Sequence, residues 1–175
     1  MRDPLWVFAY GSLLWDPGFE VVEQVQGRLV GYQRSFCMRS IHHRGTEENP
    51  GLVLALDQAT EGVCDGLVLR AQKAAPTLAY LRERELISSA YLETWQQVSL
   101  TDGRQIEAVC YVIDPDHRQY CQLDLETQAL IIAQAKGGRG PNREYLFNTV
   151  DRLEALRLPD DDLTWLADRV RSLGA

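Results

Sequence analysis

The run Leu5-Trp6-Val7-Phe8-Ala9-Tyr10 is unbroken in its apolar character and ends directly at Gly11-Ser12. A short apolar run that stops at a glycine is typical of a buried strand that opens into a tight loop. We therefore predict that the fold begins with a buried strand and that a glycine loop stands at the end of this strand.

Further strands are indicated by segments rich in Val, Leu and aromatic residues that are separated by turn-forming residues. They are residues 25–38, 52–57, 63–69, 95–100 and 105–113. The last two flank Asp102-Gly103, a dipeptide that favours a tight hairpin. The sequence therefore predicts a large, curved sheet.

Helical patterns follow the strands. Pro76 suits a first helical turn, so we predict a short helix over residues 75–86. A second helix is predicted over residues 126–136, and Pro141 opens a third. A last helix follows Pro159 and is capped by Asp160 to Asp162. This order predicts an α+β fold rather than an alternating α/β sheet, and a small closed or nearly closed barrel with helices at its side fits it. We expect one domain, residues 1–175.

Composition narrows the classes of function. The formal charge of −7 disfavours nucleic acid and anionic membranes as partners, and no apolar run is long enough for a membrane helix. The four cysteines are widely spaced, so we expect buried thiols, no disulfide framework, no metal and a cytoplasmic location. The sequence makes no prediction of oligomeric state.

The loop at the first strand carries a resemblance to a known family. The run from Phe8 to Phe19, FAYGSLLWDPGF, closely resembles the signature loop of ChaC-type γ-glutamylcyclotransferases. Further matches follow in the family's order: His43-Arg44-Gly45-Thr46 with Pro50-Gly51, then Arg84-Glu85 with Tyr91 and Trp95, then Gly137 to Gly140 with Asn142-Arg143-Glu144-Tyr145-Leu146. The spacing after Glu85 is similar to that of the bacterial branch, although Leu86 and Ser89 stand where Met and Gly are expected.

The resemblance implies a mixed β-barrel with flanking helices and an enzyme that needs no cofactor. The implied reaction cleaves glutathione to 5-oxoproline and cysteinylglycine, with Glu85 as general acid/base. The loop Tyr10-Gly11-Ser12-Leu13 is expected to bind the γ-glutamyl group, and Tyr145 is a further candidate for substrate binding. Glutathione carries two carboxylates, so local cations are needed, and Arg39 is the first choice among the arginines near the motifs.

Residue chemistry supports these roles but leaves alternatives open. Glu85 shares a predicted helical face with Leu78 and Leu81, so we expect desolvation to raise its pKa, whereas Glu83 should face solvent. Without the resemblance, a surface glutamate paired with Arg82 or Arg84 is the favoured interpretation of Glu85, and the family motif reverses that preference. Two alternative functions are left open. The first is cleavage of other γ-glutamyl compounds, with formation of the same 5-oxoproline ring. The second is a non-catalytic binding module linked to cation transport.

Overall fold

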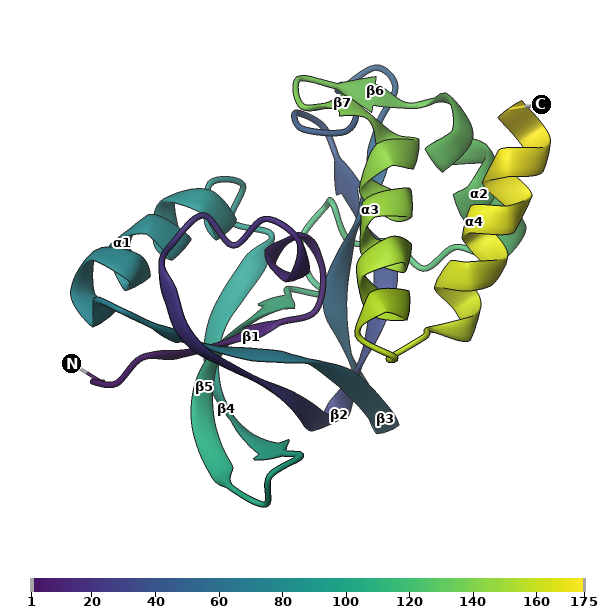
Figure 1. Ribbon diagram of the computed structural model, residues 1–175. Coiled ribbons are helices and arrows are strands. Elements are labelled where there is room, and N and C mark those ends of the chain that lie inside the picture. The colour runs from purple at the N-terminus through teal and green to yellow at the C-terminus, as the bar shows by residue number, and fades with distance from the viewer. Residues whose placement is uncertain (1, 175) are drawn as a thin grey trace. The chain divides into compact units, whose positions relative to one another are not determined.

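The computed structural model describes residues 2–174 and is built around one closed barrel (Figure 1). Its strands run in the order β1-β3-β2-β4-β5, and β1 also pairs with β5. Their bounds are β1 Trp6–Ala9, β2 Val21–Ser40, β3 Gly51–Ala71, β4 Tyr91–Leu100 and β5 Gln105–Ile113. The predicted α+β class and the predicted barrel are confirmed.

The barrel is mixed, because its first strand has one antiparallel and one parallel neighbour. Strand β1 pairs with β3 antiparallel from Trp6 opposite Arg70 to Ala9 opposite Leu67, and it meets β5 in parallel at Val7. All four residues of β1 are buried, which is why the sequence there is continuously apolar. The predicted first strand is therefore the buried partner that closes the barrel.

The strand pattern differs from the prediction in one place. Residues 52–57 and 63–69 form one continuous strand, β3, rather than two strands separated by a turn. Gly62 is the turn-forming residue between these two segments, but it instead allows close approach of β2, because a Cβ atom there would lie 2.9 Å from the Tyr32 carbonyl oxygen. The polar residues around it lie on an extended strand, so polarity alone was a misleading turn signal.

The helices match the predicted positions. They are the 3-10 turn η1 Ser12–Leu14 and the α-helices α1 Ala74–Glu85, α2 Leu125–Gln134, α3 Asn142–Ala155 and α4 Asp161–Gly174. Asp160 caps α4 as predicted, since its carboxylate accepts the Leu163 N–H at 3.1 Å. A two-residue hairpin, β6 Lys136–Gly137 with β7 Gly140–Pro141, lies between α2 and α3 and was not predicted.

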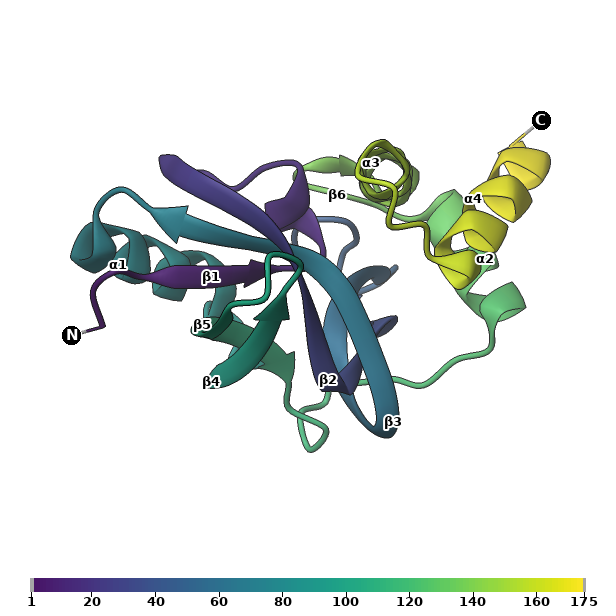
Figure 2. The same ribbon diagram turned by 60° about the horizontal axis from the view of Figure 1, so that its bottom comes forward.

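The chain divides into two compact units. The barrel unit comprises the chain up to Ser35 and Ala55–Arg118, and the helical unit comprises Phe36–Leu54 and Gln119–Ala175. In the helical unit α2, α3 and α4 gather together (Figures 1 and 2) and bury Ile132, Leu146 and Leu166. Strands β2 and β3 each contribute residues to both units, and the single domain of residues 1–175 stays a prediction.

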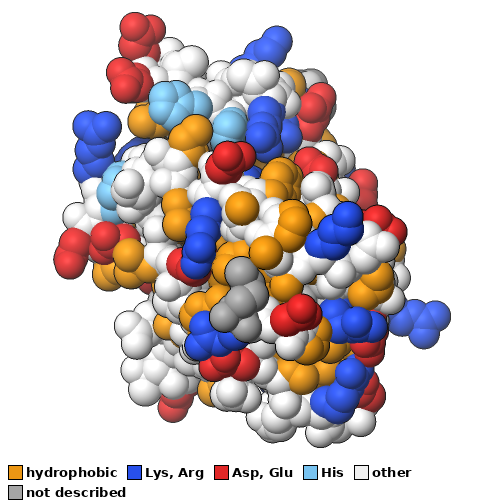
Figure 3. Space-filling view, turned by 90° about the vertical axis from the view of Figure 1, so that its left-hand side faces the viewer, with side chains coloured by type: hydrophobic (Ala, Val, Ile, Leu, Met, Phe, Trp, Pro, Cys, Tyr) orange, Lys and Arg blue, Asp and Glu red, His pale blue; other side chains and the backbone are white. Residues whose placement is uncertain are grey.

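Two features of the surface bear on function. Within residues 2–174, no helix combines the length and the apolar character that a membrane span requires. Basic and acidic side chains are interspersed over the face shown in Figure 3, with apolar side chains between them. On this face a small anionic ligand would therefore depend on individual cations rather than on a broad positive field.

Candidate active site

The loop after β1 turns sharply and presents backbone donors. The Leu14 N–H donates to the Gly11 carbonyl oxygen at 2.9 Å, and the Asp16 N–H donates to the Ser12 carbonyl oxygen at 2.8 Å. Within the described residues, the N–H groups of Gly11, Ser12 and Leu13 donate to no protein acceptor. Three successive unused amides at the start of a helical turn are able to bind an anionic oxygen.

Tyr10 fixes the start of this loop. Its hydroxyl donates to the Tyr111 carbonyl oxygen at 2.7 Å, and its own carbonyl oxygen accepts from Arg34 Nε at 2.7 Å. The side chain is only 7% exposed. Tyr10 therefore ties the loop to the barrel wall through both its side chain and its backbone.

Glu85 is the last residue of α1 and lies on the face of the helix that Leu78 and Leu81 bury. Its side chain is 13% exposed, whereas Glu83, two residues earlier, is exposed. The predicted orientation of the two carboxylates is therefore confirmed. Arg84 Nε lies 3.4 Å from Glu85 Oε1, so the alternative pairing is also present, but it involves a largely buried carboxylate rather than a surface one.

Arg84 connects α1 to the loop that follows β1. Its Nη2 donates to Ser12 Oγ at 2.9 Å, and its Nη1 donates to the Asp16 carbonyl oxygen at 2.6 Å. The same nitrogen lies 3.1 Å from the Tyr80 hydroxyl. The barrel unit thus joins Glu85 and the Ser12 loop through one guanidinium group.

A second carboxylate lies near the first. Glu93 on β4 accepts from Arg82 Nε and Nη2, each at 2.9 Å, and from the Tyr111 hydroxyl at 3.1 Å. The hydrogen bonds from Arg82 hold the pKa of Glu93 below its usual value. Burial, and then the charges of Glu93 and Glu85, raise the pKa of Tyr111, so its phenol remains a neutral donor.

Arg39 and Tyr145 belong to the helical unit. Arg39 is half-buried on β2, its backbone pairs with Gln119, and its guanidinium makes no hydrogen bond or ion pair with another described residue. Tyr145 on α3 is 6% exposed and its hydroxyl accepts the Leu54 N–H at 3.1 Å. The Tyr145 hydroxyl thus has the backbone partner expected of a core tyrosine.

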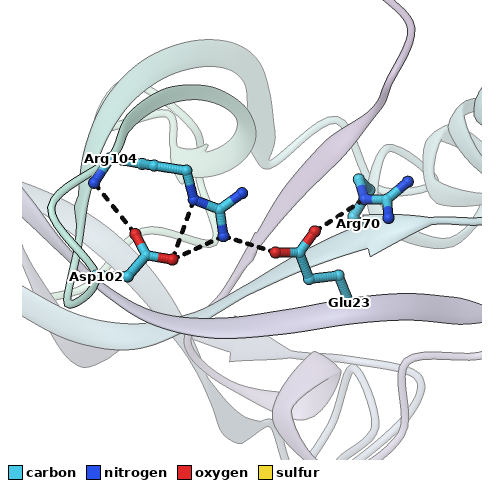
Figure 4. A network of polar contacts seen from close by, with 4 residues as sticks. All are labelled: Glu23, Arg70, Asp102 and Arg104. Atoms are coloured by element: carbon cyan, nitrogen blue, oxygen red, sulfur yellow. Dashed lines mark hydrogen bonds and ion pairs between the residues drawn. The ribbon is translucent and has the colours of Figure 1, made fainter.

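A separate polar network of four charged residues also lies in the barrel unit (Figure 4). Glu23 accepts from Arg104 Nη2 at 2.6 Å and from Arg70 Nε at 3.1 Å, while Asp102 accepts from Arg104. These contacts join the β4–β5 turn to β2 and β3. Because the groups are partly exposed and mutually paired, this network connects strands and offers no unpaired reactive group.

Among the described residues there is neither a cluster of metal ligands nor a disulfide. In the part of the chain that the structure describes, no group of three His, Cys, Asp or Glu is placed to hold a metal ion. None of the four cysteines forms a disulfide, and all four are buried. Burial raises the pKa of the Cys110 thiol, which makes it a poor nucleophile.

Sequence reasoning missed the connecting residues of the site. Arg84 was considered only as a partner of Glu85, and Tyr80 and Gly18 were not considered as a contact. Gly18 has φ +75°, and a Cβ atom there would lie 1.9 Å from the Tyr80 hydroxyl oxygen. The adjacent pair Arg84-Glu85 and the Pro17-Gly18 end of the loop motif were the signals that could have pointed to them.

Comparison with solved structures identifies the class to which this fold belongs. A γ-glutamyl cyclotransferase specific to glutathione from yeast superposes with a TM-score of 0.84 at 23% identity, covering 96% of both chains. A second structure, a γ-glutamyl cyclotransferase, gives a TM-score of 0.60 at 17% identity and covers 93% of this chain and 85% of the other. The fold is therefore that of the γ-glutamylcyclotransferases.

The family follows from sequence. The ChaC-like protein family matches residues 5–173, and the chain belongs to this family. The glutathione-specific γ-glutamylcyclotransferase of Escherichia coli is 38% identical over 97% of this chain and 74% of its own length. Arabidopsis thaliana γ-glutamylcyclotransferase 2-3 is 35% identical over 97% of this chain and 89% of its own.

Proposed function

We propose that this protein is a γ-glutamylcyclotransferase that converts glutathione to 5-oxoproline and cysteinylglycine, with Glu85 as the general acid/base. The observation that carries the proposal is the pairing, within the barrel unit, of a largely buried glutamate with a loop of unused backbone amides. The glutathione specificity named for the E. coli relative supports the choice of substrate.

The reaction needs no nucleophile from the protein. The α-amine of the γ-glutamyl residue attacks its own γ-carbonyl carbon, a C–N bond closes the five-membered lactam, and the C–N bond to the cysteine nitrogen breaks. Intramolecular attack gains effective molarities on the order of 10⁵ to 10⁸ M when the geometry is enforced. The protein therefore contributes mainly substrate conformation and proton transfer.

Glu85 suits the proton transfers. The α-amine arrives as an ammonium ion, so a base must remove a proton before the attack, and the departing cysteine nitrogen must gain one. A single carboxylate performs both steps in turn, and the reaction consumes no water and leaves Glu85 in its original state. The side chain of Glu85 is only 13% exposed, so these proton transfers would take place largely away from bulk water.

The Tyr10-Gly11-Ser12-Leu13 loop is suited to stabilise the γ-carbonyl oxygen of the substrate. As the amine attacks, negative charge develops on the γ-carbonyl oxygen, and donors aimed at that oxygen stabilise the transition state. We assign this role to the Gly11, Ser12 and Leu13 amides with the Ser12 hydroxyl. Tyr10 positions the loop, and Leu13, which is 6% exposed, supports it from the core.

Arg39 and Tyr145 are proposed as contacts for the rest of the substrate. A half-buried guanidinium without a described partner suits a glutathione carboxylate. Tyr145 rests on the family resemblance alone. We also propose a cytoplasmic location, since four cysteines that form no disulfide suit a reducing compartment.

The test is turnover by wild type and the Glu85→Gln variant on glutathione and on a panel of γ-glutamyl amino acids, with 5-oxoproline and released amine measured by mass spectrometry. Glu83→Gln is the matched control, because it makes the same change two residues away on the exposed face of α1. We expect Glu85→Gln to lose turnover by at least about 10³-fold with glutathione binding retained, and Glu83→Gln to match wild type.

The other outcomes separate the alternatives. Equal activity in Glu85→Gln and wild type would remove Glu85 from its role. Turnover of other γ-glutamyl compounds but not of glutathione would keep the chemistry and change the substrate. Absence of 5-oxoproline from every compound would favour a binding module.

A further inference from the structure

The guanidinium of Arg84 is nearly buried, and each of its three nitrogens contacts a protein group. Its side chain is 8% exposed, and Nη1 reaches the Pro17 carbonyl oxygen at 3.3 Å as well as that of Asp16. Burying a guanidinium is costly unless its donors are satisfied. Because most of its described contacts go to one loop and to its own helix, we assign the buried guanidinium of Arg84 to holding these two segments together.

The acceptors around Arg84 come from one loop and one helix. Ser12 Oγ, the Asp16 carbonyl and the Pro17 carbonyl all belong to the loop after β1, whereas the Tyr80 hydroxyl and the Glu85 carboxylate belong to α1. The guanidinium group is planar and its N–H bonds point in fixed directions. It therefore restricts the positions of its acceptors more tightly than a lysine ammonium group would. Arg84 thus sets the position of the loop relative to the end of α1.

The contact to Ser12 also sets the direction of a proton. Because Ser12 Oγ accepts a hydrogen bond from Arg84, its own O–H must point toward a different group. Among the described residues this hydroxyl donates to no protein acceptor. The guanidinium therefore leaves Ser12 as an oriented donor beside the loop amides.

We infer that Arg84 is a positioning residue that aligns the Ser12 hydroxyl and the loop amides with the Glu85 carboxylate. The inference rests on the proposed function, because it specifies how two parts of that site are held in register. Displacement of about 1 Å in such an arrangement costs about 10²-fold in rate. In this role Arg84 acts through Ser12 and Glu85.

The experiment compares Arg84→Ala and Arg84→Lys with Arg28→Ala. Arg28 is a matched control, because it is also an arginine of the barrel unit bonded to an acceptor, Asp65 at 2.8 Å, but it is 59% exposed. We expect Arg84→Ala to lower kcat/KM for glutathione about 100-fold, mostly through kcat. The kcat/KM of Arg84→Lys should lie between those of Arg84→Ala and wild type. Arg28→Ala should match wild type.

Two readouts separate positioning from simple loss of structure. Added guanidinium ion, below denaturing concentrations, should raise the activity of Arg84→Ala about tenfold, because the free ion can donate to the same acceptors. It should not help Ser12→Ala. In addition, the Ser12→Ala and Arg84→Ala effects should be less than multiplicative in the double variant, since Arg84 acts partly through Ser12.

The inference is overturned if Arg84→Ala and Arg28→Ala have equal kcat/KM, or if rescue is absent and the two effects multiply. Hydrogen exchange of the Leu14, Trp15 and Asp16 amides, which are hydrogen-bonded within the loop, tests positioning without turnover. We expect exchange at least about tenfold faster in Arg84→Ala than in Arg28→Ala, because the loop loses its anchor. If wild type forms no 5-oxoproline, the proposed function fails while this exchange measurement still decides whether Arg84 holds the loop, and equal exchange would refute it.

Discussion

Gly18 offers a sharp test of the loop's attachment to α1. The change Gly18→Ala introduces two distinct penalties. A side chain at φ +75° costs about 1–2 kcal/mol. The new Cβ atom would also lie 1.9 Å from the Tyr80 hydroxyl oxygen, so Tyr80 must move.

Moving Tyr80 breaks its hydrogen bond with Arg84, and hydrogen bonds to charged groups contribute about 1.5–3 kcal/mol. Gly31→Ala is a matched control, since Gly31 has φ +95° and a Cβ atom there meets nothing within 4 Å. Both variants share the backbone penalty and the change in unfolded-state entropy. The difference between them therefore isolates the contact with Tyr80.

We expect the free energy of unfolding in urea to be lower in Gly18→Ala than in Gly31→Ala by about 1.5 kcal/mol or more, which corresponds to about 3–6 °C in Tm. Glutathione turnover should also fall in Gly18→Ala and remain near wild type in Gly31→Ala. Equal unfolding free energies and equal turnover in the two variants would refute the reasoning that Tyr80 and Arg84 hold this loop.

Two further predictions concern buried polar groups. Asn142 is fully buried, and its side chain bonds both the N–H and the C=O of Leu52 at 2.8 Å. We expect Asn142→Ala to lower the free energy of unfolding by about 3 kcal/mol, measured in urea, whereas exposed Asn49→Ala should change little. The pKa of Glu93 is lowered chiefly by Arg82, so its stabilisation is present above about pH 4.3 and lost as pH falls through the lower folded value. Glu93→Gln should therefore be less stable at pH 7 and lose less stability between pH 5 and 3, and an unchanged pH slope would contradict this assignment.

Much of the fold could be predicted because local patterns and tertiary structure agree. The apolar run before Gly11 became a fully buried strand, and Asp102-Gly103 became the turn between β4 and β5. The error at Gly62 arose because a glycine that permits close strand approach and a glycine that permits a turn look alike in sequence. The hairpin of β6 and β7 was missed because two-residue strands carry no periodic signal.

The candidate site was only partly predictable. The helical spacing of Leu78, Leu81 and Glu85 fixed which carboxylate lies on the buried face, because side chains four residues apart share a face. The contacts of Arg84 could not be predicted, since they join residues more than 60 positions apart and depend on how α1 lies against the loop.

The sequence by itself determined the family, the order of the elements and the orientation of Glu85, because motifs, turn residues and helical periodicity are local properties of the chain. Only the tertiary structure decided that β3 is continuous, that Tyr10 is fixed to the barrel wall, and that Arg84 joins Ser12 to Glu85. Those features depend on which distant backbone and side-chain groups satisfy one another's hydrogen bonds, and no local pattern encodes that pairing.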